Sequence, residues 1–246
     1  MENDLQYEIE WNPVKISRLW NYYSLHKPYS EQYFTNIYGQ SMLDKILKNV
    51  ELNNLKILDF GSGPGFFFQK MIVNKINCDY YALDFSDKSI SSLKNKFEKN
   101  KMFCDAITVQ DLPSPYKNDF FDIVLSFEVI EHITEEQLSS MLQEVNRLLK
   151  KGGNFIITTP NKEQLELENN FCPECGCVYH KWQHITSWNQ DKINVIFSKY
   201  GFKTKSIIET EFMNCSDLSL KGILKRLYSK YKGNIPPHLL YIGEKV

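Results

Sequence analysis

The 246-residue sequence lacks several features that would place it in a special class of protein. It contains no run of about 18 or more apolar residues, so no transmembrane helix is expected. The first residues, MENDLQYEIEW, are acidic and lack the apolar stretch that a secretory signal carries. The formal net charge is only −1, which argues against a protein that grips nucleic acid with its whole surface. We therefore expect a cytoplasmic protein with a small-molecule or carbohydrate-linked partner, while a local basic patch for nucleic acid stays open.

Cysteine is scarce except in one segment. The stretch NNFCPECGCVYHKWQHITSW (169–188) holds three of the six cysteines and two of the five histidines. In a chain without an export signal, this clustering favours reduced thiols and metal binding over disulfides. The segment is therefore a candidate metal site.

Short apolar segments alternate with helical patterns from residue 56 onward. Strands are expected at residues 56–60, 79–86, 102–108, 120–128 and 154–160, and two further β segments at 202–212 and 237–246. This alternation predicts an α/β fold with a mostly parallel sheet covered by helices on both faces. The last two segments are expected to form an antiparallel hairpin at the edge of the sheet.

The stretch LDFGSGPG (58–65) follows the first of these strands and precedes a helical pattern, which is the setting of a nucleotide-binding loop. Gly61 permits a sharp turn, and Gly63 and Gly65 let the backbone approach a ligand closely. The last glycine of the dinucleotide pattern G-x-G-x-x-G would fall at Phe66, so that interpretation fails. The stretch instead resembles the first motif of class I S-adenosylmethionine-dependent methyltransferases, in which an acid, here Asp59, precedes three spaced glycines.

This resemblance implies a Rossmann-like seven-stranded sheet and S-adenosylmethionine as the cofactor. Asp84, at the end of the second strand, would accept hydrogen bonds from both ribose hydroxyls, and Asp105 resembles the acid that contacts the adenine. The expected cofactor-binding residues are Asp59, Gly61, Ser62, Gly63, Gly65, Asp84, Phe85, Asp105, Ala106 and Phe127. The expected organisation is an N-terminal helical cap (1–50), a cofactor-binding core (51–161), a Cys/His-rich insert (162–188) and the remainder of the core (189–246).

A second group of polar residues follows the fourth expected strand in the stretch SFEVIEHI. Glu128, Glu131 and His132 would share one face if a helix began there, at the mouth of the site. In one interpretation they shape the pocket or act as a general base. In the other they bind a divalent cation, for which Mn²⁺, Fe²⁺, Zn²⁺ and Mg²⁺ are all candidates.

The Glu-x-x-Glu-His pattern resembles that of the small-RNA 3′-terminal 2′-O-methyltransferases. That family has a further metal-binding histidine after the fifth strand, followed four residues later by an aromatic residue. His184 and Trp188 fit this pattern, so the resemblance implies that His184 is the fourth ligand of a catalytic ion. The basic surface that those enzymes use for RNA is mostly missing from this chain.

The cysteine segment allows two sets of ligands for a structural zinc ion, which takes four. Cys172, Cys175, His180 and His184 form one set, and Cys172, Cys175, Cys177 and His180 form the other. The second set is preferred because it leaves His184 for the catalytic ion. The segment also resembles loops of bacterial surface-polysaccharide and capsule methyltransferases, some of which act on sugars or phosphoramidate groups.

These observations predict a metal-assisted O-methyltransferase that acts on a small anionic or sugar-like acceptor, such as a capsule precursor or a phosphoramidate. Two alternatives stay open. The first is an RNA 2′-O-methyltransferase that uses the basic segment LSLKGILKRLYSKYKGN (218–234), which is expected to be helical. The second is a regulatory protein that binds S-adenosylmethionine without catalysis.

Overall fold

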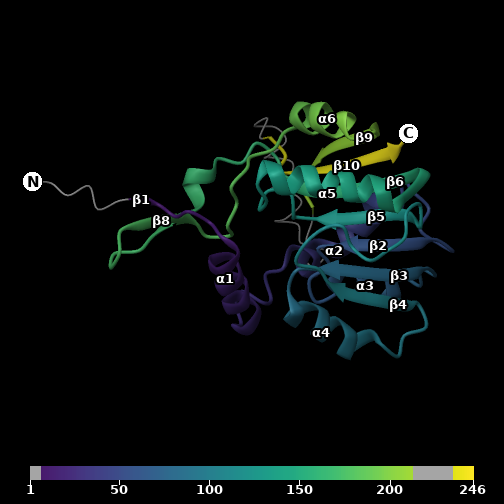
Figure 1. Cartoon of the computed structure of the whole chain (residues 1–246), viewed down its shortest axis with the longest axis horizontal. Helices are drawn as coiled ribbons and strands as arrows, with labels where there is room; N and C mark the ends of the chain where they lie inside the picture. Colours follow the sequence, from purple (N-terminus) through teal and green to yellow (C-terminus); the bar gives the residue numbers. More distant parts are fainter. Residues whose placement is uncertain (1–6, 213–234) are drawn as a thin grey trace, which may run out of the picture.

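A computed structural model describes residues 7–212 and 235–246 (Figure 1). The basic segment 218–234, which is expected to be helical, lies outside the described residues. Within the described ranges, no helix is long and apolar enough to cross a membrane.

A seven-stranded sheet forms the centre of the molecule, with strand order β4-β3-β2-β5-β6-β10-β9. Its strands are β2 (Lys56–Phe60), β3 (Asp79–Asp84), β4 (Phe103–Thr108), β5 (Phe121–Phe127), β6 (Leu149–Pro160), β9 (Phe202–Thr210) and β10 (His238–Lys245). The first five are parallel to one another, and β10 is antiparallel to both β6 and β9. The predicted α/β sheet and its final antiparallel hairpin are therefore confirmed.

Helices cover both faces of this sheet (Figure 1). They are α2 (Phe34–Ile46), α3 (Phe66–Val73), α4 (Asp87–Phe97), α5 (Glu135–Leu148) and α6 (Gln190–Lys199), while α1 (Pro13–Leu25) lies to one side of the sheet. Helices α2, α3 and α4 contribute to one buried apolar cluster, and α5 and α6 contribute to the other. The near-continuous apolar runs of the central strands follow from this arrangement, because both faces of a parallel sheet are buried.

The apolar spacing of α5 shows how the sequence produces this packing. Leu138, Met141, Leu142, Val145 and Leu148 recur every three or four residues and are all buried. They form one stripe that packs on the sheet while the opposite face stays in water. Truncating Leu142, which is fully buried, to alanine would cost about 2–5 kcal/mol of stability through lost contacts and a cavity.

A second, three-stranded sheet lies beside the main one and has the order β1-β8-β7 (Figure 1). It consists of β1 (Tyr7–Glu8), β7 (Asn169–Phe171) and β8 (Cys177–His180). A short 3₁₀ helix, η1 (Leu165–Glu168), leads into β7 from the main sheet. The hairpin β7–β8 carries the three clustered cysteines, and β1 brings the N-terminal segment alongside it in parallel.

Candidate active site

The glycine loop joins β2 to α3 at the carboxyl edge of the sheet, where parallel α/β folds place their ligands. Gly61 has φ +83°, and a Cβ atom there would lie 2.6 Å from a methyl group of Val129. Only glycine fits this position, because both the backbone angle and the contact exclude a side chain. The loop therefore packs directly against the segment that follows β5.

Two buried acids flank the glycine loop, and one of them, Asp84, bonds to it. Oδ2 of Asp84 accepts a hydrogen bond from the Gly63 amide (2.8 Å), and Oδ1 accepts one from the Ser86 amide (2.8 Å). Oδ2 of Asp59 accepts a hydrogen bond from the Tyr80 hydroxyl (2.8 Å). Burial raises the pKa of Asp59 to about 7 and that of Asp84 to about 6. Both positions match the methyltransferase motif, and a ribose with two hydroxyl donors would favour the charged form of Asp84.

The other expected cofactor residues lie around the same loop. Ser62 is buried in it, Phe85 follows Asp84 and is largely exposed, and the Phe127 ring packs against Phe67 with centroids 4.6 Å apart. Sequence reasoning missed Tyr33, whose ring would lie 3.5 Å from a Cβ atom at Gly63. Burial and the nearby Asp84 charge raise the pKa of Tyr33 to about 12, so it stays a neutral hydroxyl over the loop.

An acid that contacts the adenine would be expected at the end of its strand, and Asp105 is not in that place. Asp105 lies in the middle of β4, opposite Tyr81, whereas Thr108 pairs with Asp84 at the carboxyl edge. Oδ2 of Asp105 accepts a hydrogen bond from the Tyr116 hydroxyl (3.2 Å), and Ala106 is buried in the apolar core. Thr108 and the residues after it, rather than Asp105, therefore stand at the carboxyl edge of β4.

The expected helix start at Glu128 is also wrong. A capping box formed by Thr134 and Gln137 opens α5 at Glu135, so residues 128–133 form a loop. Glu128 itself has φ +51°, a conformation that a residue with a Cβ rarely adopts. The two carboxylates are therefore brought together by a loop and not by one face of a helix. A strained backbone angle such as that of Glu128 is characteristic of functional sites.

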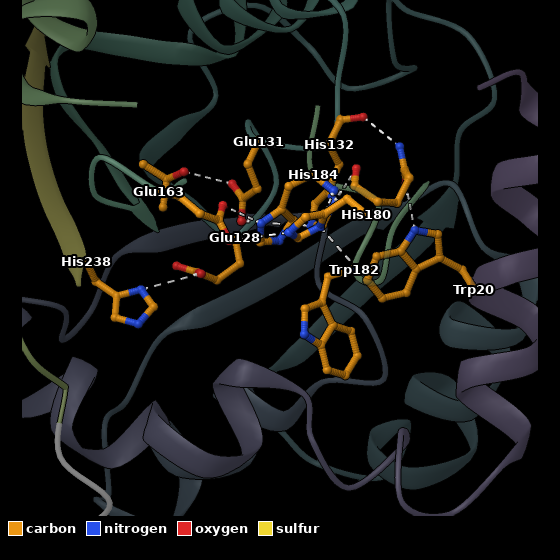
Figure 2. Close-up of polar contacts among 11 residues, drawn as sticks. Trp20, Glu128, Glu131, His132, Glu163, His180, Trp182, His184 and His238 are labelled. Carbon is orange, nitrogen blue, oxygen red and sulfur yellow. Dashed lines mark hydrogen bonds and ion pairs between the residues drawn. The ribbon is translucent and has the colours of Figure 1, made fainter. Parts of the chain in front are cut away.

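Four of the chain's five histidines gather with three glutamates at this edge of the sheet (Figure 2). The ligand atoms of Glu131, His132 and His184 lie within 4.8 Å of one another, and so do those of Glu163, His180 and His184. We call the seven residues the acid–histidine cluster: Glu128, Glu131, His132, Glu163, His180, His184 and His238.

Glu163 and His238 were not expected from the sequence. Oε2 of Glu163 lies 2.6 Å from Nδ1 of His184, and its other oxygen lies 3.6 Å from Nε2 of His180. His238 opens β10, and its Nδ1 lies 3.6 Å from Oε2 of Glu128. Glu128 stands outside the set formed by Glu131, His132 and His184, and its role as a direct ligand of the same ion stays a prediction.

Several buried ligand atoms of the cluster have no hydrogen-bond partner among the described residues. They are Oε1 of Glu128, Oε1 of Glu131, Nε2 of His180 and Nδ1 of His238. An unpartnered buried polar atom costs about 1–3 kcal/mol. A cation coordinated by some of these atoms would remove that cost, so the donor set fits a divalent metal ion with oxygen and imidazole ligands.

The charge states in the cluster follow from its burial. Burial raises the pKa of Glu128 to about 8 and that of Glu131 well above its usual range. Burial lowers the pKa of His132 to about 3, so this imidazole is neutral near pH 7 and its lone pair is available. Burial alone would raise the pKa of Glu163, but the imidazoles of His180 and His184 beside its carboxylate lower it to about 2.

Backbone bonds fix the segment that carries His184 against the loop after β5. The amides of Ile185 and Thr186 donate to the Glu131 carbonyl (2.8 and 3.2 Å). The Gln183 side-chain amide donates to the His132 carbonyl (2.8 Å) and accepts from the Trp20 indole (2.9 Å). Helix α1 is therefore docked onto the cluster through Trp20.

The two expected zinc sets that include His180 are not formed. Sγ atoms of Cys172, Cys175 and Cys177 lie within 4.8 Å of one another, but His180 belongs to the acid–histidine cluster. The reason is the direction of β8, which starts at Cys177 and delivers His180 to the far end of the strand. There its ring stacks on His184 with centroids 4.4 Å apart.

Comparisons with known proteins agree with this geometry. A family model described as a methyltransferase domain matches residues 51–211. A ubiquinone biosynthesis O-methyltransferase of Pelagibacter ubique is 25% identical over 231 residues, which cover 87% of this chain and 90% of the relative.

Solved structures share the fold at low sequence identity. An S-adenosylmethionine-dependent methyltransferase of Mesorhizobium loti superposes with a TM-score of 0.61 at 15% identity, covering 84% of this chain and 98% of that one. A protein of Pyrococcus horikoshii superposes with a TM-score of 0.62 at 15% identity, covering 90% of this chain and 100% of that one. With the family model matching most of its length, the chain belongs to the S-adenosylmethionine-dependent class I methyltransferases.

Proposed function

We propose that this methyltransferase transfers the methyl group to a hydroxyl oxygen of a small acceptor with two neighbouring oxygens, such as a sugar diol. The observation that carries the proposal is the set of buried, unpartnered atoms of the acid–histidine cluster: the carboxylate oxygens of Glu128 and Glu131 after β5, with imidazole nitrogens of His180 and His238. Val129, which lies in that same loop, packs against Gly61 of the cofactor loop. Acceptor and methyl donor would therefore meet at one edge of the sheet.

Glu131, His132 and His184 are the residues that would hold a divalent cation, because their ligand atoms already converge. A bound cation would supply Lewis-acid chemistry there, lowering the pKa of an acceptor hydroxyl and fixing its direction. The chain's own groups prepare this set. The Thr159 hydroxyl donates to one oxygen of Glu131 (2.9 Å) and leaves the other oxygen free.

Glu128 is the group that would take the acceptor's proton. It stands beside the converging ligands, and one of its oxygens is buried without a partner. A carboxylate whose pKa is raised to about 8 is well matched to proton transfer near neutral pH. The hydroxyl oxygen would then form its bond to the methyl carbon as the carbon–sulfur bond of S-adenosylmethionine breaks, leaving S-adenosylhomocysteine.

Two indole rings support a cyclic acceptor. Trp20 packs edge-on against His132 with centroids 5.2 Å apart, and Trp182 lies beside the cluster (Figure 2). Aromatic faces of this kind pack against sugar or aromatic rings and exclude water from a reacting centre. The relative from Pelagibacter ubique is named an O-methyltransferase, which agrees with oxygen as the accepting atom. Transfer to an RNA 2′-hydroxyl, the alternative from the sequence, draws on the segment 218–234, outside the described residues.

The test is transfer of a labelled methyl group to a panel of sugar diols, catechols and a short RNA, with Mn²⁺, Mg²⁺ or Zn²⁺ or with a chelator. We expect Glu131→Gln to reduce transfer by at least ~100-fold, the scale of a lost catalytic group, while the affinity for S-adenosylmethionine stays within a few fold. Glu136→Gln, an exposed acid on α5, is the control and should transfer normally. Full transfer by the chelator-treated enzyme would exclude the cation's role.

A further inference from the structure

A second group of metal-binding side chains lies outside the acid–histidine cluster, on the hairpin β7–β8. The thiols of Cys172, Cys175 and Cys177 lie within 4.8 Å of one another, and the last two sulfur atoms are 3.3 Å apart. The proposed methyl transfer uses none of them. None of the three is bonded to another cysteine as a disulfide among the described residues.

The backbone of the hairpin holds these thiols on one side of a tight turn. The Cys172 amide donates to the Cys177 carbonyl (2.9 Å), and the Gly176 amide donates to the Cys172 carbonyl (2.9 Å). Gly176 has φ +77°, which allows the chain to reverse between Cys175 and Cys177. The turn is therefore preorganised, so little ordering entropy is lost when a ligand joins the three sulfur atoms.

Packing accounts for only one of the three thiols, that of Cys177, which is buried. Cys175 is exposed and Cys172 is half-buried, whereas free cysteine normally behaves as a small buried apolar residue. A thiolate is the form that binds soft metal ions.

We propose that Cys172, Cys175 and Cys177 bind a zinc ion that fastens the N-terminal strand β1 to the hairpin. The three sulfur atoms supply three ligands, and a water molecule on the exposed side of Cys175 completes the tetrahedron. The ion and the acid–histidine cluster share no residue. The site is therefore independent of the proposed catalytic chemistry.

Strand β1 needs such a support because it is very short. It spans two residues and joins β8 through the Tyr7 amide, which donates to the Gly176 carbonyl (3.2 Å), and the Ile9 amide, which donates to the Val178 carbonyl (3.0 Å). Both acceptors lie in or next to the turn that the thiols would close. An ion that rigidifies this turn would keep β1 paired.

Fixing β1 would also affect the active site, because the N-terminal segment connects β1 to helix α1. Trp11 follows β1 and packs edge-on against Tyr179 of β8, with centroids 6.4 Å apart. Helix α1 begins two residues later and places Trp20 against His132 and Gln183. In Figure 1 the small sheet and α1 lie together on one side of the main sheet. The zinc ion would thus fix the attachment of the helix that covers the acid–histidine cluster.

The first test measures metal in the full chain after purification with supplied zinc. We expect Cys175→Ser and Cys177→Ser each to lose one equivalent of zinc per chain relative to the parent. Cys104→Ser, a cysteine on β4 outside the group, should lose none. Titration of the metal-free parent with Co²⁺ should give a thiolate-to-cobalt absorption band, present in Glu131→Gln and absent in Cys175→Ser.

The second test is hydrogen exchange. The amides of Tyr7 and Ile9 should exchange at least ~10-fold faster in Cys175→Ser or after zinc removal, since local opening governs exchange. The Leu58 amide in the central strand should be unaffected. Zinc retained in both serine variants, or a parent with no cobalt–thiolate band, overturns the proposal, and so does unchanged exchange at β1 when zinc is removed.

Discussion

Nδ1 of His184 lies 2.6 Å from a carboxylate oxygen of Glu163, so one nitrogen of this imidazole is already engaged. If Nδ1 carries the proton, Nε2 is the nitrogen left for a metal ion. A carboxylate behind a ligating histidine fixes its tautomer and orientation and raises its basicity. Glu163 is therefore a positioning residue that acts through His184.

The first prediction concerns that pair. Glu163→Gln should weaken the binding of a divalent cation by about 10–100-fold, because the histidine loses its charged partner. Calorimetric titration of the metal-free protein with Mn²⁺ or Zn²⁺ measures the change. Glu168→Gln is the matched control, since Glu168 pairs with Lys181 in the same segment without touching the cluster. Equal affinities in the two variants would remove Glu163 from this role.

A second prediction concerns pH and the cofactor. Burial raises the pKa of Asp84 to about 6, and ribose hydroxyls donate best to the ionised form. The affinity for S-adenosylmethionine should therefore fall as the pH is lowered from about 7.5 toward 5, as the carboxylate gains a proton. Fluorescence or calorimetric titration across this range measures the slope. Asp84→Asn should bind weakly with a flatter profile, and a parent profile as flat as that of the variant contradicts the assignment.

A third prediction concerns the stability of the metal-free protein. Burial raises the pKa of Glu128 to about 8, above its usual value near 4.5. A group with a raised pKa makes its full contribution to stability at pH values below its pKa in the unfolded protein. The contribution is lost as the pH rises through its pKa in the folded protein. In the presence of a chelator, the free energy of unfolding of Glu128→Gln should therefore rise relative to that of the parent by roughly 1–3 kcal/mol as the pH increases from 5 to 8.5. Urea unfolding at several pH values measures this difference, and a constant difference across the range would count against it.

The fourth prediction uses two glycines with similar backbone angles. Gly61 has φ +83° and a Cβ there would meet Val129 at 2.6 Å, whereas Gly152 has φ +78° and nothing within 4 Å. Gly61→Ala should lower cofactor affinity by at least ~10-fold, because both the cofactor loop and the loop after β5 must shift. Gly152→Ala carries only the backbone strain, about 1–3 kcal/mol, and should bind the cofactor normally. Binding and thermal unfolding of both variants separate the two effects.

The order of strands and helices could be predicted because its signals are local. Apolar runs of four to eight residues and stripes at helical spacing do not depend on distant partners. The positions of the glycine loop and of Asp84 at the ends of their strands could be predicted for the same reason, since each is defined by its place relative to one strand. The boundary of α5 was missed although the Thr134–Gln137 capping box is visible in the sequence.

The parts that escaped prediction depend on contacts between distant segments. His238 enters the site only because β10 pairs with β6, which sets His238 opposite Pro160. Glu163 is an acid in a loop, without periodic or motif-based signal. Asp105 was misplaced because the register of β4 against β3 decides which residue reaches the edge of the sheet. Whether His180 lies near the three thiols or near Glu163 likewise depends on the direction of β8, which the sequence does not specify.

The insertion of β10 between β6 and β9 has a consequence for how the protein is made. Neither neighbour of β10 pairs with the other, so β9 has no place in the main sheet until residues 238–245 have joined it. His238 is the first residue of that strand, and it reaches Glu128 in the same event. During synthesis, the glycine loop and the residues after β5 leave the ribosome long before this strand. The cofactor-binding half can therefore form early, whereas the acid–histidine cluster gains its last member only when this strand locks the sheet.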